Sequence, residues 1–252
     1  MTAYCLALAA TPDDLAAAQR LRYSVFVEEM GSDGPLVDHA ARREIDRFDP
    51  FFDHLILRDT SRPRDEQVIG AYRLARGDQV ARAGAFYSES EFDLEPLRAT
   101  GRRLLELGRS CLHPEYRGGV ALHHLWSGLS EYIARHGIEI LFGVASFRGT
   151  DPAPIAPTLS VLHHRHLAPP ELRPRARPDG AVPMDALAFA KIDRVSAMRA
   201  LPPLIKAYLR LGAWVGQDAY IDRVFNTTDV CMVCDIRAIT EEQRARFDGL
   251  RA

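Results

Sequence analysis

Short apolar runs and amphipathic segments follow one another along the chain, which predicts a mixed α/β protein. Apolar runs predict strands at residues 4–9, 54–58, 68–74, 103–112, 138–147 and 229–236. Apolar positions at helical spacing predict helices at residues 89–98, 120–135, 153–164, 198–211 and 240–250, after a first helix that begins near residue 11. Because strands come first and then alternate with helices, we expect one mixed central sheet with helices on both faces.

The start of the first helix carries several local signals. Thr11 is a suitable N-cap, and Pro12 suits the first helical position. Asp13 and Asp14 then place negative charge in the first turn, where the helix dipole favours it. The apolar face of this helix follows helical spacing through Leu15, Ala18, Leu21, Val25 and Phe26.

The chain shows no internal repeat and no linker long enough to separate two autonomous domains. Residues 168–184 are rich in Pro and Arg and predict an extended loop. We therefore expect a single domain over residues 1–252, with an N-terminal helical lobe at about residues 11–50 and a C-terminal lobe at about residues 195–252.

Composition and charge exclude several classes of protein. Hydrophobic residues make up 47% and charged residues 26%, a balance that favours a folded globular domain over a disordered chain. The formal net charge of −2 lacks the basic excess of a general nucleic-acid binder. No run approaches ~20 apolar residues, and the N-terminus lacks the basic flank of a signal peptide, so we expect a cytoplasmic protein.

Residues 104–121 combine a strand, a glycine turn and the start of a helix. The strand carries Glu106 and Arg109, and the turn contains Gly118 and Gly119. Unpaired amides at a helix N-terminus form an anion site, and Arg117 adds a planar phosphate donor beside it. The pattern indicates that a phosphate is held while chemistry occurs at the strand; the alternative is an ordinary strand–turn–helix junction with solvated charges.

Residues 112–119, LHPEYRGG, resemble the phosphate-binding turn of the GNAT N-acetyltransferase superfamily. The family turn usually reads R/Q-x-x-G-x-G/A, whereas this turn continues as RGGVA. The departure favours a donor with a single phosphate over one with a pyrophosphate.

Further segments resemble one branch of that superfamily. RYSVF, EIDRFD, GAYRL and the Glu106-x-x-Arg109 pair are similar, in order and spacing, to the signature of acyl-homoserine-lactone synthases. The complete set is most similar to the bacterial ornithine–acyl-ACP N-acyltransferases. The segments that carry this resemblance lie within residues 22–233 and read RYSVFVEEMG, DRFDPFFDHLIL, VIGAYRL, LELGRSCLHPEYRGG, LFGVASFRGTDP, LPPLIKAYLRLGAWVG and IDRVFNTTDV.

The resemblance implies a GNAT-like fold and an acyltransferase activity. The enzyme would move a fatty acyl group, commonly 3-hydroxylated, from acyl carrier protein to the α-amine of ornithine, giving lyso-ornithine lipid. The expected partners are acyl carrier protein and ornithine, with no nucleic acid. The phosphopantetheine-linked acyl group of the carrier is the donor, and no other cofactor and no metal is expected.

Such a reaction needs a base, because an α-ammonium with a reference pKa of roughly 8 must lose a proton before it attacks a thioester. Glu106 is the first choice, followed by Asp46 and Asp49. A backbone amide near Cys111 or Leu112 would polarise the thioester carbonyl. Direct attack by the amine needs no enzyme nucleophile. The expected catalytic residues are Glu106, Asp46 and Arg109.

Ornithine carries two ammonium groups and one carboxylate, so its pocket should pair acids with the amines and an arginine with the carboxylate. The expected substrate-binding residues are Arg22, Phe26, Asp49, Arg73, Tyr208, Asp222 and Asp229. The expected donor phosphate-binding residues are Cys111, Arg117, Gly118 and Gly119. For Arg22, Arg73 and Arg109, the alternative is a set of structural ion pairs that tie the N-terminal lobe to the sheet.

Acyl carrier protein is acidic, so a basic surface should meet it. The candidate clusters are Arg102 with Arg103, and Arg173, Arg175 and Arg177 in the loop. Residues 197–215 form a basic amphipathic segment that would pack on the core or lie on anionic lipid. Since the expected product is a lipid, peripheral contact with the inner membrane remains an expectation.

Three other motifs favour structural interpretations over catalytic or metal-binding ones. His54 and Asp59 spell the H-x4-D motif of glycerolipid acyltransferases, but strand alternation should place them on opposite faces. Cys231 and Cys234 have metal or redox spacing without a second pair, which favours buried apolar cysteines. The histidines at 163, 164 and 166 favour a solvated helix end.

Three alternative functions stay open at this point. The first is an autoinducer synthase, although VEEMG after Phe26 lacks the tryptophan usual in that family. The second is an O-acyltransferase. The third is a non-catalytic protein that binds an acyl carrier.

Overall fold

The computed structural model describes residues 4–243, which fold into two compact units. The first unit contains residues 4–85 and Leu107–Gly137. The second contains Phe86–Glu106 and residues 138–243. The β7 strand (Leu104–Leu112) contributes its first three residues to the second unit and the rest to the first. The expectation of a single domain stays a prediction.

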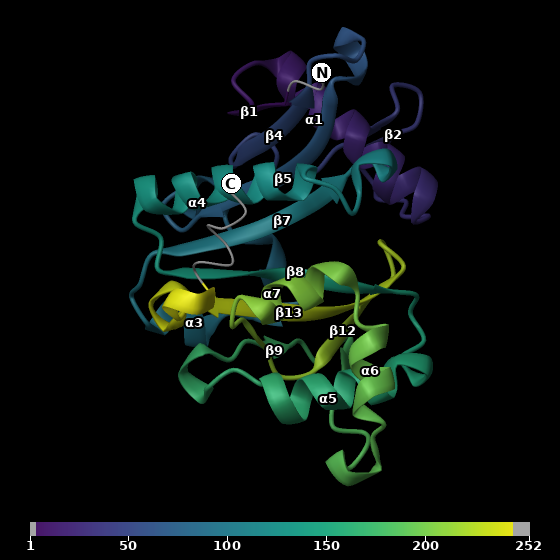
Figure 1. Cartoon of the computed structure of the whole chain (residues 1–252), viewed down its shortest axis with the longest axis vertical. Helices are drawn as coiled ribbons and strands as arrows, with labels where there is room; N and C mark the ends of the chain where they lie inside the picture. The colour runs from purple at the N-terminus through teal and green to yellow at the C-terminus, as the bar shows by residue number, and fades with distance from the viewer. Residues whose placement is uncertain (1–3, 244–252) are drawn as a thin grey trace. The chain divides into compact units, whose positions relative to one another are not determined.

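Antiparallel strands form the sheet of the first unit. β1 (Tyr4–Leu8) pairs with β4 (Asp53–Asp59) along its whole length, and β4 pairs with β5 (Val68–Arg76). β7 follows β5 in the strand order (Figure 1). The strands predicted at residues 4–9, 54–58 and 68–74 are confirmed; β4 and β5 are buried along most of their length, whereas β1 is only partly buried.

Helices cover both faces of this sheet. α1 (Pro12–Arg22) packs Ala18 and Leu21 against Ile56 and Ala71. The neighbouring residues of the same strands, Leu55 and Gly70, point the other way toward α4 (Ala121–His136). α4 approaches closely through Gly128, where an added Cβ would lie 2.1 Å from Leu6.

The predicted start of the first helix is confirmed. The hydroxyl of Thr11 accepts a hydrogen bond from the N–H of Asp14, and the carboxylate of Asp14 accepts one from the N–H of Thr11. Beyond Arg22 the helix continues as a π-helical segment, η1 (Tyr23–Glu29). A short hairpin follows, formed by β2 (Val37–Asp38) and β3 (Arg43–Glu44).

The second unit has a mixed sheet. Leu104–Glu106 of β7 pair in parallel with β8 (Ile140–Arg148), and β8 pairs antiparallel with β13 (Thr227–Asp235) over nine residue pairs. β12 (Ala219–Asp222) and β11 (Trp214–Val215) pair with different parts of β13. β10 (Ala181–Val182) pairs with β12. The predicted mixed α/β class is confirmed.

The remaining helices and strands are short. The helices are α2 (Val80–Ala83), α3 (Glu95–Ala99), α5 (Ala156–His166), α6 (Arg194–Ala200) and α7 (Pro203–Arg210). The 3-10 turns are η2 (Arg64–Glu66), η3 (Tyr87–Ser90), η4 (Pro114–Tyr116), η5 (Ala153–Ile155), η6 (Pro170–Leu172), η7 (Phe189–Lys191) and η8 (Ile236–Ala238). β6 (Phe92–Asp93) pairs with β9 (Arg175–Ala176).

Two helix predictions were wrong, and proline explains both. The segment 89–98 is split, because α3 begins at Glu95 with Pro96 in its first turn, while Phe92 belongs to a strand. The segment 198–211 is expected to be one helix with Pro202 and Pro203 in its first turn or at its start. The start at these prolines is confirmed by α7, but residues 198–200 belong to α6, and the two helices are separated at Leu201 and Pro202. A residue before proline is disfavoured in the helical region, so the break falls there.

Three further observations concern the ends, the loop and the surface. Thr240 and Gln243 exchange hydrogen bonds as expected at a helix start, but the rest of the predicted helix 240–250 lies outside the described residues. The loop 168–184 is largely extended, with short pieces of β9 and β10. Among residues 4–243, we find no helix that is both long and apolar enough to cross a membrane.

Candidate active site

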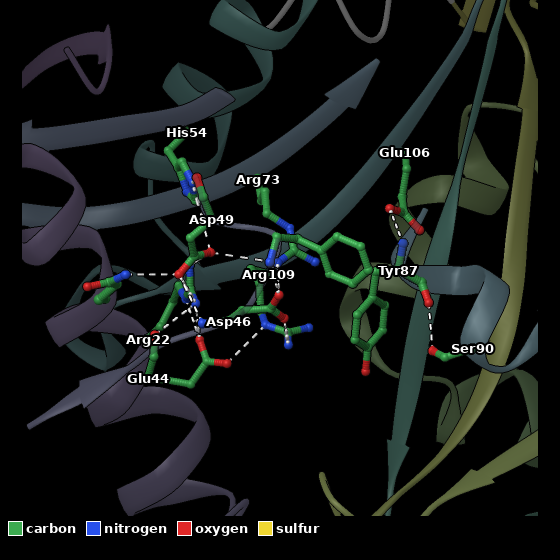
Figure 2. Close-up of polar contacts among 12 residues, drawn as sticks. Arg22, Glu44, Asp46, Asp49, His54, Arg73, Tyr87, Ser90, Glu106 and Arg109 are labelled. Carbon is green, nitrogen blue, oxygen red and sulfur yellow. Dashed lines mark hydrogen bonds and ion pairs between the residues drawn. The ribbon is translucent and has the colours of Figure 1, made fainter. Parts of the chain in front are cut away.

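The first unit contains a network of ion pairs that is almost fully buried (Figure 2). Its members come from α1, β3 and the turn after it, β5 and β7. They are Arg22, Glu44, Asp46, Asp49, Arg73 and Arg109. Three positive and three negative side chains cancel formally, which lowers the cost of burying them together. We call this set the ion-pair network.

Asp49 lies at the centre of the ion-pair network. Its Oδ1 accepts a hydrogen bond from Nη1 of Arg22 at 2.8 Å, and its Oδ2 accepts one from Nη2 at 3.1 Å. Oδ2 also accepts bonds from Nε2 of Gln19 and from the N–H of Asp46. Nη1 of Arg73 lies 3.7 Å from Oδ1. Asp49 therefore ties α1 and β5 to the turn that carries Asp46.

Asp46 is held by two arginines. Nη1 of Arg73 lies 3.0 Å from its Oδ1, and Arg109 donates a short hydrogen bond to its Oδ2. Burial alone would raise the pKa of this carboxyl, but the charges of Arg73 and Arg109 lower it. Burial would likewise raise the pKa of Asp49, and the charge of Arg22 lowers it. Lowered pKa values make both carboxylates poor proton acceptors near neutral pH.

Arg109 reaches this network from a strained backbone. Its φ of 51° is left-handed, a conformation that costs a residue with a Cβ ~1–2 kcal/mol. The turn in the strand directs its side chain toward Glu44, whose Oε1 accepts a bond from Nε at 3.2 Å. Such strain persists only where surrounding contacts compensate for it, and here the ion pairs do so.

His54 sits beside the same network. Its Nε2 lies 3.1 Å from the backbone oxygen of Asp49. Burial lowers the pKa of His54 to about 4, so the ring is neutral near pH 7. Asp59 instead accepts bonds from Tyr116 and Ser61. Within residues 4–243, His54 and Asp59 therefore form no acid–base pair, and the motif that they spell has no catalytic geometry.

Glu106 lies in the second unit, on the part of β7 that pairs with β8. Its side chain is 2% exposed. Oε2 accepts a hydrogen bond from the N–H of Tyr87 at 2.9 Å (Figure 2). Oε1 accepts one from the N–H of Ser88 at 2.6 Å. A carboxylate offers about four lone-pair sites, so two remain for a substrate proton or a water.

The predicted phosphate-binding turn follows β7 in the first unit. Arg117 donates two hydrogen bonds to the carboxylate of Glu29, at 2.8 and 2.6 Å, and one to the backbone oxygen of Leu112. Gly118 has a φ of +75°, which favours glycine, and α4 begins three residues later. The turn and the helix start lie where the sequence predicts them. The pairing of Arg117 with Glu29 was not predicted from the sequence.

Three carboxylates meet at a second place in the second unit. Glu91, Asp222 and Asp229 each bring one oxygen to within 4.8 Å of the others, close enough to share a cation such as a metal ion or an ammonium group. All three side chains are buried. We call these residues the acidic cluster. The phenol of Tyr87 donates to Oδ2 of Asp222 at 3.3 Å.

Electrostatics distinguish the acidic cluster from the ion-pair network. Each carboxylate of the ion-pair network lies beside an arginine, whereas the carboxylates of the acidic cluster lie beside one another. Burial and the negative charges of Asp229 and Asp222 raise the pKa of Glu91 well above its usual range. Burial also raises the pKa of Asp229. The cluster therefore retains a proton at a pH where ordinary carboxyls are ionised.

The remaining predicted residues lie elsewhere. Phe26 is half-buried against the apolar cluster under α1, and Tyr208 is half-buried on α7. Cys111 is buried on β7, and burial raises the pKa of its thiol to about 12. Cys231 and Cys234 are free and buried, as expected for apolar strand residues.

Two functional candidates were missed by sequence reasoning. Glu44 lies in the EIDRFD segment beside the predicted site residues Asp46 and Asp49, so the motif itself indicates it as a candidate. Glu91 is one of several acids in the run SESEFD, and nothing local separates it from a solvated charge. The pairing of β12 with β13 brings Asp222 and Asp229 near each other, and Glu91 joins them only in the folded second unit.

Comparison with known proteins adds to this geometry. A family model described as an acetyltransferase (GNAT) domain matches residues 21–127. The L-ornithine N(alpha)-acyltransferase of Rhodobacter capsulatus is 54% identical over 243 residues, covering 96% of this chain and 93% of that protein. The L-ornithine N(alpha)-acyltransferase of Brucella abortus is 44% identical, covering 89% and 81%.

Solved structures show the same fold at low identity. FeeM, an N-acyl amino acid synthase from uncultured soil microbes, matches with a TM-score of 0.55 and 12% identity, covering 97% of this chain and 98% of FeeM. BjaI, a CoA-dependent acyl-homoserine lactone synthase, matches with a TM-score of 0.53 and 15% identity, covering 98% and 89%. The predicted GNAT-like fold is confirmed.

Proposed function

Because the chain belongs to the L-ornithine N(alpha)-acyltransferase family, we propose that it transfers a fatty acyl group to the α-amine of L-ornithine. It is an acyltransferase with a GNAT domain. The observation that carries the choice of acceptor is the 54% identity to the Rhodobacter capsulatus enzyme across 96% of the chain. An autoinducer synthase is less well supported, since BjaI shares 15% identity.

The proposed donor is a (3-hydroxy)fatty acyl thioester of acyl carrier protein, and the proposed product is lyso-ornithine lipid. Support comes from the turn between β7 and α4, which departs from the pattern of a pyrophosphate site. Its glycine at φ +75° and the following helix start suit a single phosphate. Arg117 lies at the same turn and is paired with Glu29, so a donor phosphate would compete with Glu29 for its guanidinium group. The carrier is the protein partner that this proposal requires, and peripheral contact with the inner membrane stays a prediction.

The proposed chemistry is direct attack of the neutral α-amine on the thioester carbonyl. The amine nitrogen forms a bond to the carbonyl carbon, the C–S bond breaks, and the thiol of the phosphopantetheine arm leaves. The amine gives up a proton during the reaction, and a base placed nearby typically supplies ~10²–10⁴-fold in rate.

Glu106 is the best candidate for that base. Its two backbone hydrogen bonds fix the carboxylate and leave lone pairs to receive the proton, directly or through a water. Asp46 and Asp49 are less suitable, because neighbouring arginines lower their pKa values. Cys111 is unsuited as a nucleophile, because burial raises its pKa and keeps the thiol protonated.

In this proposal the ion-pair network has a structural role. Each arginine in it already contacts carboxylates of the same network, which suits a frame that fixes β7 and the turn after β3. This is the structural alternative for Arg22, Arg73 and Arg109. Substrate contact by these arginines would require them to exchange a carboxylate of the chain for the carboxylate of ornithine.

The proposed function is tested with purified full-length protein, L-ornithine and 3-hydroxyacyl carrier protein, and the product is identified by mass spectrometry. The expected product is Nα-(3-hydroxyacyl)ornithine. The acyl-CoA of the same chain serves as the comparison donor. Expression of the chain alone in a host without ornithine lipids gives a second readout. A lactone in the medium, or no acylated amino acid at all, would contradict the proposal.

A further inference from the structure

The acidic cluster of the second unit brings together three buried carboxyl groups that the proposed acyl transfer to the α-amine does not use. Glu91, Asp222 and Asp229 are 3%, 8% and 2% exposed. Burying an ionised carboxylate is costly unless a positive charge or several hydrogen bonds accompany it. Residues 4–243 supply hydrogen bonds to only part of this cluster.

Asp222 is the member whose oxygens are satisfied. Its Oδ1 accepts bonds from the N–H groups of Val224 and Phe225, at 2.7 and 3.0 Å, which caps the turn after β12. Its Oδ2 accepts the phenol of Tyr87. Asp222 is therefore held in place by the fold whether or not a ligand is present.

Glu91 and Asp229 are not satisfied in the same way. Oε2 of Glu91 and Oδ1 of Asp229 are buried, and while both groups are ionised neither atom has a hydrogen-bond donor among the described residues. When no cation is bound, a proton shared between the two carboxyls takes the place of that donor. Buried acceptors without a donor are rare in folded proteins and call for an explanation. Two such atoms in one cluster, beside a third carboxylate, mark a place prepared for a group that donates hydrogen bonds and carries positive charge.

We propose that the acidic cluster binds the side-chain ammonium group of the amino-acid acceptor, with Glu91 and Asp229 as its direct ligands. The inference rests on the proposed function and deepens it, because it assigns the residues that select a diamino acid. An ammonium group offers three N–H donors, and three carboxylates surround the site.

The two amines of ornithine need opposite environments. The α-amine must be neutral to attack, whereas the side-chain amine stays charged throughout the reaction. A negative cluster stabilises an ammonium and raises its pKa, so it suits the amine that does not react. The same cluster around the α-amine would oppose catalysis.

The raised pKa values in the acidic cluster agree with its assignment to the side-chain ammonium. Burial and the neighbouring carboxylates raise the pKa of Glu91, and burial raises the pKa of Asp229, so the cluster binds a proton more readily than ordinary carboxyls do when no cation is present. Binding of an ammonium would replace that proton. Among the described residues, Tyr87, Tyr220 and Cys231 also interact with the cluster, from the turn before Glu91, from β12 and from β13.

The test compares two acceptors with the full-length protein and an acyl carrier protein donor. L-Norvaline has the carbon skeleton of L-ornithine without the side-chain ammonium. The variants are Glu91→Gln and Asp229→Asn, and Asp185→Asn is the control because Asp185 is exposed. We expect KM for ornithine to rise about 30-fold or more in both cluster variants, as when one partner of a buried charge pair is removed. The kcat/KM for norvaline should stay within about threefold of the wild-type value.

Each other outcome has a distinct meaning. If the wild-type protein acylates neither acceptor, the proposed function fails. If it acylates ornithine and the cluster variants keep the same preference for ornithine over norvaline, the inference fails and the function stands. Equal loss of both acceptors would indicate a structural role and would also overturn the inference. So would a stoichiometric divalent metal ion that is present in the purified wild-type protein and absent from both variants.

Discussion

Nη1 of Arg22 lies 2.8 Å from Oδ1 of Asp49, and this contact joins the end of α1 to the turn that follows β3. Both side chains are almost completely buried. Arg22 also donates to Glu44, so one guanidinium group links two carboxylates from the hairpin segment to the helix. The pair therefore fixes the position of residues 44–49 in the first unit.

Removing this guanidinium should destabilise the protein. We expect Arg22→Gln to lower the free energy of unfolding by about 3–5 kcal/mol, because it leaves Glu44 and Asp49 buried without their partner. The control is Arg42→Gln, which breaks the exposed pair with Glu28 and should cost about 1 kcal/mol or less. Urea denaturation followed by circular dichroism measures both. Similar losses in the two variants would contradict the buried-network interpretation.

The two buried clusters should give opposite pH dependences. The lowered pKa values of Asp46 and Asp49 mean that their stabilisation is present above the unfolded pKa of about 4 and is lost as pH falls further. The raised pKa of Glu91 means that its destabilisation appears as pH rises above about 4, by up to about 1.4 kcal/mol per pH unit for one proton.

Urea denaturation between pH 3 and 8 distinguishes these effects. Asp46→Asn should flatten the acid limb of the stability curve. Glu91→Gln should increase the free energy of unfolding at pH 8 relative to the wild type, even though it weakens ornithine binding. A Glu91→Gln variant that is less stable than the wild type at pH 8 would show that the charge of Glu91 is compensated.

Glu106→Gln should separate binding from chemistry. We expect kcat to fall about 10²-fold or more, because the amide cannot accept the proton of the amine. Binding of acyl carrier protein should persist. The free energy of unfolding should fall by about 1–3 kcal/mol, because the amide oxygen accepts one backbone bond while the amide nitrogen faces the other N–H. Single-turnover kinetics and donor titration give the two readouts. Unchanged turnover would transfer the role of base to another group.

The glycine turn offers a matched pair of substitutions. Gly118 has a left-handed φ of +75°, whereas an added Cβ at Gly119 would lie 3.8 Å from the oxygen of Tyr116, an ordinary contact. Gly118→Ala should cost ~1–2 kcal/mol of backbone strain and raise KM for the acyl donor about tenfold. Gly119→Ala should leave KM nearly unchanged. Equal values for the two variants would argue against a donor site at this turn.

The cysteines should be dispensable for turnover. Burial raises the pKa of Cys111 and of Cys234 to about 12, so neither is a thiolate near pH 7. Iodoacetamide should label the exposed Cys5 in the folded protein and reach Cys111 only after unfolding. Cys111→Ala should keep kcat within about threefold of the wild-type value. A large loss of kcat without a loss of stability would favour a covalent intermediate.

Local signals account for the elements that were predicted well. Thr11 and Pro12 define a helix start through contacts within one turn, so neighbouring residues suffice to predict it. The strands β4 and β5 are apolar runs whose burial is nearly complete. The break between α6 and α7 at Pro202 also has a local cause, because proline restricts the conformation of the residue before it. β12 is four residues long and is stabilised by its pairing with β13, so its sequence carries little signal.

The sequence by itself determined the fold class, the acyltransferase family and the individual charged residues, because periodicity and ordered motifs are properties of the chain. Only the tertiary structure decided which charges meet. Tyr87 and Asp222 are separated by 135 residues and share a hydrogen bond, while Arg22 and Asp49 neutralise each other. The free energy of a buried charge depends on its neighbours in space, so identical carboxylates acquire lowered pKa values in one unit and raised values in the other.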